Sequence, residues 1–295
     1  MAKFATVGFV GLGVMGEPMC RNLVQKSSFS VVAYDLNPEP LKRLETYGVA
    51  PAQDLAETVS NADAIMISLP SGFEVDALCT MEDGLLSLAR AGQTIVDLGT
   101  TPVALTRQLA TGFAAKDVAF ADAPVSRTRA AAEAGTLSIL VGGDKAVFES
   151  ISTILDCFAE EVTLCGGIGA GQMVKQLNNM VLTETVVALA EALSVGRRAG
   201  LDDKLLFETL SKCSADSFAL RNHGMKALLP DEFPKRAFPT AYMLKDIDYA
   251  LALAQDNGLE LPGASLAKRL LEESSEAGYA DNYFPALIKV LDPGD

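Results

Sequence analysis

The sequence lacks several residue types and spacings that mark particular classes of protein. It has no tryptophan, one histidine and five cysteines in 295 residues. The cysteines are odd in number, lie far apart and include no C-x-x-C spacing: Cys20, Cys79, Cys157, Cys165 and Cys213. This pattern favours neither a disulfide framework nor a zinc site. We therefore expect no bound metal and a reducing compartment, the cytoplasm.

Positive charge and long apolar runs are also scarce. Lysine and arginine total 24 against 38 aspartates and glutamates, and the formal net charge is −14 without a local basic stripe. Such a chain repels nucleic acid. The longest apolar runs are broken well short of the roughly 20 residues that cross a bilayer. We expect a small-molecule partner, and neither nucleic acid nor a membrane.

The first half of the chain has the pattern of a parallel α/β sheet. Short β-rich runs alternate with amphipathic segments up to about residue 165. This alternation is typical of βαβ units whose sheet is covered on both faces. The runs expected as strands are 4–10, 30–35, 64–70, 93–99, 118–124, 137–143 and 161–165.

The second half is expected to be helical throughout. Its first helix follows glycines near residue 168, carries Arg197 and Arg198 in its last turn and stops at Gly200. Apolar residues on nearly every side of its middle predict a buried central helix. Shorter helices are expected at 202–213, 240–256, 263–276 and 284–291. The sequence thus predicts an α/β Rossmann-type N-terminal domain (1–165) followed by an all-α C-terminal domain (166–295).

A glycine-rich motif points to a dinucleotide. In "VGFVGLGVMGEPMC", Gly11, Gly13 and Gly16 come directly after an apolar run and before an amphipathic one. These glycines allow a tight turn, close approach of a pyrophosphate and close helix packing, respectively. Asp35 ends the second predicted strand, where a carboxylate can bind the ribose hydroxyls and repel a 2′-phosphate. NAD is therefore expected rather than NADP; the alternative is a glycine-rich turn that binds no dinucleotide.

Hydride transfer to or from a nicotinamide also needs a proton donor or acceptor. The single histidine, His223, lies among polar residues and is expected at the surface rather than in catalysis. Lys175 and Asn179 are four residues apart and share one helix face. A lysine in an apolar helix is partly desolvated, which lowers its pKa toward the range of an acid/base group. The alternative for Lys175 is a surface lysine whose stem packs on apolar residues.

Four motifs together resemble the β-hydroxyacid dehydrogenase family over essentially the full chain. They are "GFVGLGVMGEPMCRNL", "DAPVS" with "AGTLSILVGG", "GAGQMVKQLNN" and "MLKDIDYALALA". The resemblance implies that Lys175 is the catalytic acid/base, that Asn179 and Ser126 bind substrate, and that Lys245 closes over the nicotinamide. The cofactor site that it implies comprises Gly11, Leu12, Gly13, Val14, Met15, Gly16, Asp35, Leu69, Pro70, Thr100 and Lys245. It also implies a homodimer or homotetramer. Asp246, in contrast, is expected to pair with a helix N-terminus or a nearby lysine.

The chain departs from the family in its substrate loop. The common family form is D-A-P-V-S-G-G, but here Arg127 and Thr128 replace the two glycines. An arginine can bind a carboxylate, sulfonate or phosphate through two hydrogen bonds. The Arg-Thr pair resembles the sulfolactaldehyde reductase branch, so Arg127 and Thr128 are expected to bind the anionic tail of a substrate. Arg129 is expected to be solvated or paired with Glu133, and Gly99 stands where the family often has serine.

The sequence therefore predicts an NAD-dependent oxidoreductase that interconverts a small β-hydroxy acid, or a hydroxysulfonate, with its semialdehyde. A substrate of the 3-hydroxyisobutyrate or tartronate semialdehyde type is the alternative to sulfolactaldehyde. Two further alternatives are a cofactor-binding module without turnover and an imine reductase. The presence of Lys175 and Asn179 argues against both, because relatives of those kinds lack or replace the lysine.

Overall fold

The computed structural model describes residues 4–235 and 237–293, and the chain divides into two compact units. Unit 1 is Met1–Lys175 and unit 2 is Gln176–Asp295. The division falls inside one long helix, α9 (Ala170–Arg198), which contributes its first turns to unit 1 and the remainder to unit 2. The domain boundary expected at residues 165 and 166 stays a prediction.

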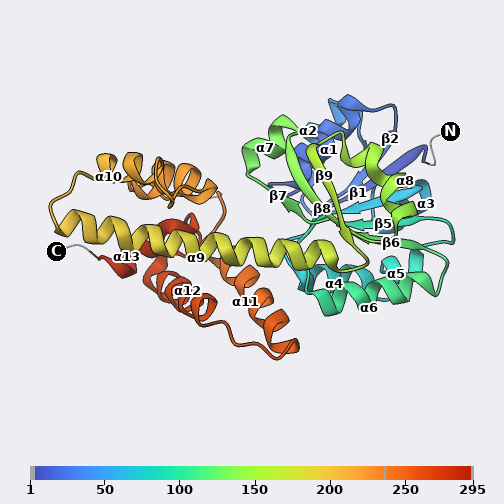
Figure 1. Ribbon diagram of the computed structural model, residues 1–295. Helices are drawn as coiled ribbons and strands as arrows, with labels where there is room; N and C mark the ends of the chain where they lie inside the picture. The colour runs from blue at the N-terminus through green and yellow to red at the C-terminus, as the bar shows by residue number, and fades with distance from the viewer. Residues whose placement is uncertain (1–3, 236, 294–295) are drawn as a thin grey trace. The chain divides into compact units, whose positions relative to one another are not determined.

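Within the described residues, unit 1 holds a nine-stranded sheet in the order β3-β2-β1-β4-β5-β6-β8-β7, with β9 paired to β8 (Figure 1). Its strands are β1 (Thr6–Val10), β2 (Ser30–Tyr34), β3 (Ala50–Pro51), β4 (Ala64–Ile67), β5 (Thr94–Asp97), β6 (Ala119–Asp122), β7 (Val125–Ser126), β8 (Leu137–Gly142) and β9 (Ala159–Gly166). Its helices before α9 are α1 (Gly16–Lys26), α2 (Pro38–Glu45), α3 (Leu55–Asn61), α4 (Gly72–Thr80), α5 (Leu85–Leu88), α6 (Val103–Ala114), α7 (Arg129–Ala134) and α8 (Lys145–Leu155).

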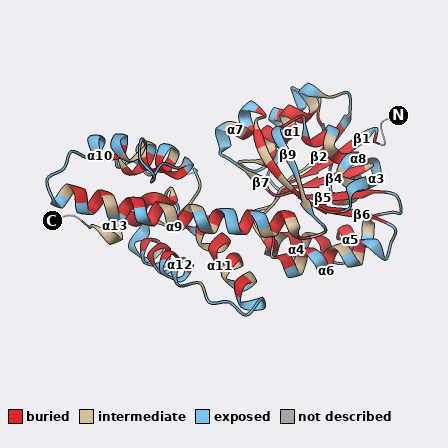
Figure 2. Ribbon diagram, viewed as in Figure 1, coloured by how far each residue is buried: buried red, intermediate tan, exposed pale blue. Residues whose placement is uncertain are grey.

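Both faces of the sheet are covered, because side chains alternate between two cores. In β1, Val7 and Phe9 join the core beneath α1, α2, α7 and α8, whereas Val10 joins the core beneath α3 to α6. The central strands are buried along their length (Figure 2). Strands β1 to β6 pair in parallel, so their carboxyl ends meet at one edge of the sheet. The expected α/β fold is confirmed, with β8 antiparallel to β6 and β7.

Unit 2 is helical, as expected. After α9 come α10 (Asp203–Leu210), a π-helix η1 (Leu220–Leu228), α11 (Thr240–Asp256), α12 (Pro262–Ser274), a short π-helical turn η2 (Ser275–Tyr279), a 3-10 turn η3 (Phe284–Leu287) and α13 (Ile288–Leu291). In the described part of unit 2, β-type pairing is confined to two isolated bridges. The apolar core gathers along α9, where Val186, Ala190 and Leu193 are buried against later helices.

The surface position expected for His223 is wrong. This residue lies in η1, is 6% exposed, and its Nδ1 shares a hydrogen bond with the Tyr283 hydroxyl. The rings of Phe218 and Phe284 also pack against it. Burial lowers the pKa of His223 to about 4. The polar neighbours in sequence misled the prediction, because two of the three side chains that contact the ring, Tyr283 and Phe284, come from about 60 positions away.

One helix in the described part of the chain, Ala170–Arg198, is long and apolar enough to cross a membrane by length and composition alone. Half of its most apolar stretch is buried inside the protein, and core helices of water-soluble proteins pass the same test.

Candidate functional site

The glycine motif forms a close-packed turn with one open position. Gly11 has φ +89°, and a Cβ there would lie 2.3 Å from the Ser68 carbonyl oxygen. A Cβ on Gly16 would lie 2.0 Å from the Gly11 oxygen, so this glycine lets α1 approach β1. A Cβ on Gly13, in contrast, would meet no atom within 4 Å. Gly13 therefore exposes its backbone to open space at the start of α1, which fits a pyrophosphate group.

Asp35 lies against the same turn, at the carboxyl end of β2. One oxygen of its carboxylate accepts the Leu12 amide at 2.5 Å, and the other accepts the Asn37 amide at 2.7 Å. Gly11 donates to the Tyr34 carbonyl at 3.0 Å, which fixes the turn to β2. Each carboxylate oxygen keeps acceptor capacity for a ribose hydroxyl. The residues present therefore fit the adenosine end of a dinucleotide.

Three further cofactor candidates, Leu69, Pro70 and Thr100, follow β4 and β5. A Cβ on Gly11 would lie 3.0 Å from Leu69 Cδ2, so Leu69 packs against the glycine turn, and Pro70 follows it at the surface. Thr100 is half-buried in the loop after β5. In this loop Gly99 donates to Asp97 Oδ1 at 2.8 Å, and a Cβ on Gly99 would lie 3.1 Å from both Asp97 Oδ1 and the Leu69 oxygen. A serine at position 99 would therefore crowd two neighbours.

Sequence reasoning missed a buried network that joins this loop to α9. Asp122, at the end of β6, accepts the Gly169 amide at 2.7 Å and the Gln172 amide at 2.8 Å. Burial raises the pKa of Asp122 to about 6, although these amide hydrogen bonds oppose the rise. The Gln172 side chain accepts from the Thr101 amide at 3.0 Å and donates to the Gly99 carbonyl at 2.9 Å. The only signal in the sequence was the aspartate of "DAPVS" at a strand end.

Lys175 and Asn179 occupy successive turns of one face of α9. Lys175 is 8% exposed and Asn179 is 3% exposed. Burial excludes the surface alternative for Lys175. The same face carries the buried polar residues Gln172 and Thr183, so it is a polar stripe on an otherwise apolar helix.

In unit 2, Asn179 is held by α11. Its Nδ2 donates to Asp246 Oδ2 at 2.6 Å, and its Oδ1 accepts from Asn178 at 3.0 Å. The other Asp246 oxygen pairs with Lys245 Nζ at 2.9 Å, which confirms the expected pairing with a nearby lysine. Lys245 Nζ also lies 5.2 Å from the centre of the Tyr249 ring. Asp246 therefore fixes both an amide and an ammonium group.

The substrate loop keeps the backbone of a glycine at Arg127. Ser126 ends β7, and Arg127 has φ +82°, a conformation that L-residues rarely adopt. The Arg127 guanidinium donates to the Thr136 carbonyl at 2.7 Å and pairs with the Glu160 carboxylate. Thr128 caps α7 by accepting the Ala131 amide at 3.4 Å. Both replacements are thus engaged within unit 1.

Arg129 pairs with Glu133 at 2.8 Å along α7. Of the two expected states, solvated or paired with Glu133, the structure shows the pair.

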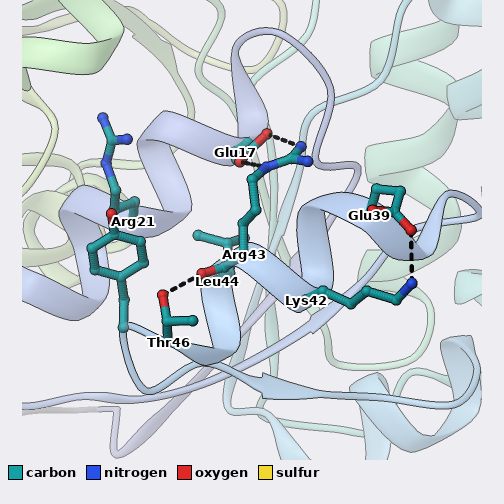
Figure 3. A pocket seen from close by; sticks show the side chains of 8 residues that line it. Glu17, Arg21, Glu39, Lys42, Arg43, Leu44 and Thr46 are labelled. Carbon is teal, nitrogen blue, oxygen red and sulfur yellow. Dashed lines mark hydrogen bonds and ion pairs between the residues drawn. The ribbon is translucent and has the colours of Figure 1, made fainter.

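A separate surface pocket between α1 and α2 is lined by Glu17, Arg21, Glu39, Lys42, Arg43, Leu44, Thr46 and Tyr47 (Figure 3). Arg43 binds Glu17 through two hydrogen bonds, and Lys42 binds Glu39 at 2.7 Å. These charges satisfy one another, so we assign the pocket no ligand. Across residues 4–235 and 237–293, no group of three or more His, Cys, Asp or Glu side chains could hold a metal ion.

Comparisons with known proteins agree with this geometry. A family profile described as the NAD binding domain of 6-phosphogluconate dehydrogenase matches residues 6–167. A second, described as NAD-binding of NADP-dependent 3-hydroxyisobutyrate dehydrogenase, matches residues 169–291.

Curated relatives and solved structures match along nearly the whole chain. The 2-(hydroxymethyl)glutarate dehydrogenase of Eubacterium barkeri is 33% identical, over 98% of this chain and 96% of that protein. The mitochondrial 3-hydroxyisobutyrate dehydrogenase of Mus musculus is 31% identical, over 99% and 88%. The structure of Mycobacterium tuberculosis 3-hydroxyisobutyrate dehydrogenase with L-serine has a TM-score of 0.89 at 31% identity, over 97% and 99%. The chain therefore belongs to the β-hydroxyacid dehydrogenase family and is an oxidoreductase that uses NAD(P).

Proposed function

We propose that the protein interconverts a small β-hydroxy acid, or a hydroxysulfonate, with its semialdehyde, using NAD(H) and Lys175 as the acid/base. The observation that carries this proposal is the buried polar stripe of α9, with Lys175 one turn before Asn179. A lysine and an amide are side chains of the types that exchange a proton with a reacting oxygen and hydrogen-bond a substrate.

Each residue then has a defined task. The bound nicotinamide accepts or supplies the hydride. Neutral Lys175 takes the proton of the substrate hydroxyl during oxidation, and its ammonium form returns a proton to the carbonyl oxygen during reduction. Asn179 and Ser126 orient the substrate, and Asp246 fixes the Asn179 amide through the 2.6 Å hydrogen bond.

The preference for NAD over NADP rests on Asp35. Its carboxylate lies against the glycine turn, where an adenosine ribose binds in this fold. A 2′-phosphate at this point would meet like charge. We propose a cofactor-binding role for Leu12, Val14 and Met15 of the turn, for Leu69, Pro70 and Thr100 after the next strands, and for Lys245 of α11.

The substrate is a small anion, and Arg127 separates the candidates. An anionic tail that binds Arg127 has to compete with the Glu160 carboxylate for the guanidinium. Sulfolactaldehyde is the leading candidate on the Arg-Thr pair; tartronate, methylmalonate and succinate semialdehydes are the alternatives. We also propose a homo-oligomer, a dimer or a tetramer.

The experiment is a panel assay. NADH oxidation by the purified protein is measured with each of the four semialdehydes, and again with NADPH. We expect turnover with NADH and the lowest KM for sulfolactaldehyde. An enzyme that binds NADH but turns over none of the four would contradict the proposed reaction.

A further inference from the structure

Gln172 holds three points of unit 1 together. Its side-chain oxygen accepts the Thr101 amide at 3.0 Å, and its side-chain nitrogen donates to the Gly99 carbonyl at 2.9 Å. Its own backbone amide donates to Asp122 Oδ2 at 2.8 Å. The residue is fully buried, so water does not replace any of these partners.

The two segments that Gln172 joins both carry residues that the proposed function uses. The loop of residues 99–101 contains Thr100, which the proposed function assigns to the cofactor cleft. This loop is fixed to its own strand by Asp97, which accepts from the Gly99 amide at 2.8 Å and the Thr101 hydroxyl at 2.6 Å. Gln172 lies in the first turn of α9, and Lys175 follows three residues later. The glutamine amide is thus a short, rigid connection between the loop and the helix that carries the lysine.

We propose that Gln172 is a positioning residue: its side-chain amide locks the 99–101 loop to the first turn of α9 and so sets the distance between Lys175 and the loop. The proposal rests on the proposed function of Lys175. An amide suits this task because it presents one donor and one acceptor side by side, matching a backbone carbonyl and a backbone amide. Proton transfer needs the lysine nitrogen within hydrogen-bond reach of the substrate oxygen.

Unit 1 contains a matched control for this residue. Gln93, 1% exposed, also binds only backbone groups: its nitrogen donates to the Val59 and Ala62 carbonyls, both at 2.7 Å, and its oxygen accepts the Arg90 amide at 2.8 Å. It precedes β5, at the opposite end of the strand from the 99–101 loop. A purely structural role for buried glutamines predicts the same behaviour at both positions.

The first test compares Gln172→Leu with Gln93→Leu. Both variants lose backbone hydrogen bonds, so we expect both to lower the melting temperature. With NADH and the best semialdehyde, well below that temperature, kcat of Gln172→Leu should fall on the order of 10²-fold, the loss expected from a misplacement of about 1 Å. Gln93→Leu should keep the kcat of the parent. Equal kcat values for the two variants would overturn the proposal.

The second test, Gln172→Glu, does not depend on the leucine variant folding. The protonated carboxyl can donate to the Gly99 carbonyl and accept from the Thr101 amide, whereas the ionised form can only accept. The titratable and charged groups around this position are Asp97 of β5, Arg107 of α6, Asp122 of β6, Cys165 of β9 and Lys175 of α9. Burial and the two nearby aspartates favour the neutral acid, whereas Arg107 and Lys175 oppose them; because the side chain is fully buried, its pKa should lie above the usual glutamate value.

We therefore expect kcat of Gln172→Glu, divided by that of the parent, to fall as pH rises. The ratio should approach parent-like values at the acidic end and the Gln172→Leu value at the alkaline end. A ratio that does not change with pH would contradict positioning by the amide.

Hydrogen exchange separates this proposal from the proposed function. Gln172→Leu should speed amide exchange at 99–101 and 169–175, whereas Gln93→Leu should speed it at 59–62 and near residue 90. If the parent turns over no semialdehyde, the proposed function fails, and the exchange data still decide the connection. Unchanged exchange at 99–101 in Gln172→Leu would show that the side chain does not hold the loop.

Discussion

At each edge of the unit 1 sheet, a buried or half-buried aspartate accepts backbone amides and a buried glutamine side chain binds backbone groups, but the two aspartates differ in pKa. At the amino edge, Asp63 accepts the amides of Ala5 and Thr6 at 2.8 and 3.0 Å, and Gln93 binds three backbone groups nearby. At the carboxyl edge, Asp122 accepts the Gly169 and Gln172 backbone amides, and the Gln172 side chain binds two backbone groups, the Thr101 amide and the Gly99 carbonyl.

The pKa values of the two aspartates move in opposite directions. Amide donors lower the pKa of Asp63, which keeps contact with water. Burial outweighs similar donors at Asp122 and raises its pKa to about 6. Burying a carboxylate is unfavourable at neutral pH. The ionisation of Asp122 at the carboxyl edge therefore costs stability at that pH, whereas the ionisation of Asp63 at the amino edge does not. Ligands of open α/β sheets bind outside the carboxyl ends of the strands, where such a cost is expected.

The largest expected effect is a difference in kcat between alanine variants of two lysines, one at each edge of the sheet. Lys175→Ala should lower kcat by about 10²- to 10⁴-fold, because a general acid/base is lost. Lys116 lies before β6 at the amino edge, where its ammonium binds the Leu86 and Ser87 carbonyls. Lys116→Ala should keep the parent kcat. Steady-state NADH oxidation measures both, and equal kcat values would refute the role of Lys175.

The next largest expected effect is a difference in the free energy of unfolding between asparagine variants of the two aspartates. Asp122→Asn replaces one buried carboxylate oxygen with an NH2 donor, so either the Gly169 or the Gln172 amide loses its acceptor and unfolding of unit 1 should cost roughly 3 kcal/mol less at pH 7. Asp63→Asn should lose only about 1 kcal/mol, because one oxygen of Asp63 accepts both amides and the asparagine oxygen can take its place.

The pH dependence sharpens this contrast. The folded-state pKa of Asp122 is about 6, above the ordinary value of 3.8, so its contribution is fully present below about pH 4 and is lost as pH rises through about 6. Asp63 has a lowered pKa, so its contribution is present above 3.8 and is lost as pH falls. Urea unfolding between pH 3 and 8 should show each trend disappear in the corresponding asparagine variant. Persistence of the pH 4 to 6 trend in Asp122→Asn would contradict this assignment.

Cofactor choice should respond to Asp35 at the carboxyl edge. Asp35→Ser removes the charge that faces a 2′-phosphate, so the ratio of kcat/KM for NADPH to that for NADH should rise on the order of tenfold, or about 1.4 kcal/mol. Better turnover of NADPH than NADH by the parent would already refute this role.

The smallest effects should arise in the substrate loop. Glu160→Gln weakens the hold on Arg127, so KM for a substrate with an anionic tail should fall by up to about fivefold, the range of an exposed ion pair. Arg127→Gly should raise that KM far more than the KM for methylmalonate semialdehyde. Equal changes for both substrates in either variant would remove Arg127 from substrate binding.

The sequence predicted what depends on local pattern. The helix expected at 240–256 is α11, with the same bounds, and the expected strands at 4–10, 30–35 and 64–70 contain β1, β2 and β4. Periodicity reports which face of an element is apolar, and turn glycines report where it ends. The family membership also followed from the sequence, because the four motifs and their order along the chain can be read without the structure.

The rest depends on partners that are distant in sequence. Arg127 pairs with Glu160 and His223 with Tyr283, and no local pattern announces either contact. Residues 220–228, where no helix was expected, form a π-helix. No local pattern singled out Gln172, because the loop that its side chain binds lies about 70 positions earlier.

The central claim is that the carboxyl edge of unit 1 receives the dinucleotide and the amino edge does not. Hydrogen exchange with and without NADH tests this claim most directly, because each edge contributes its own backbone amides. The account predicts protection of residues 11–16 and 99–101, with unchanged exchange at 59–63 and 90–93. Protection centred on the amino-edge segments, or none at 11–16, would contradict it.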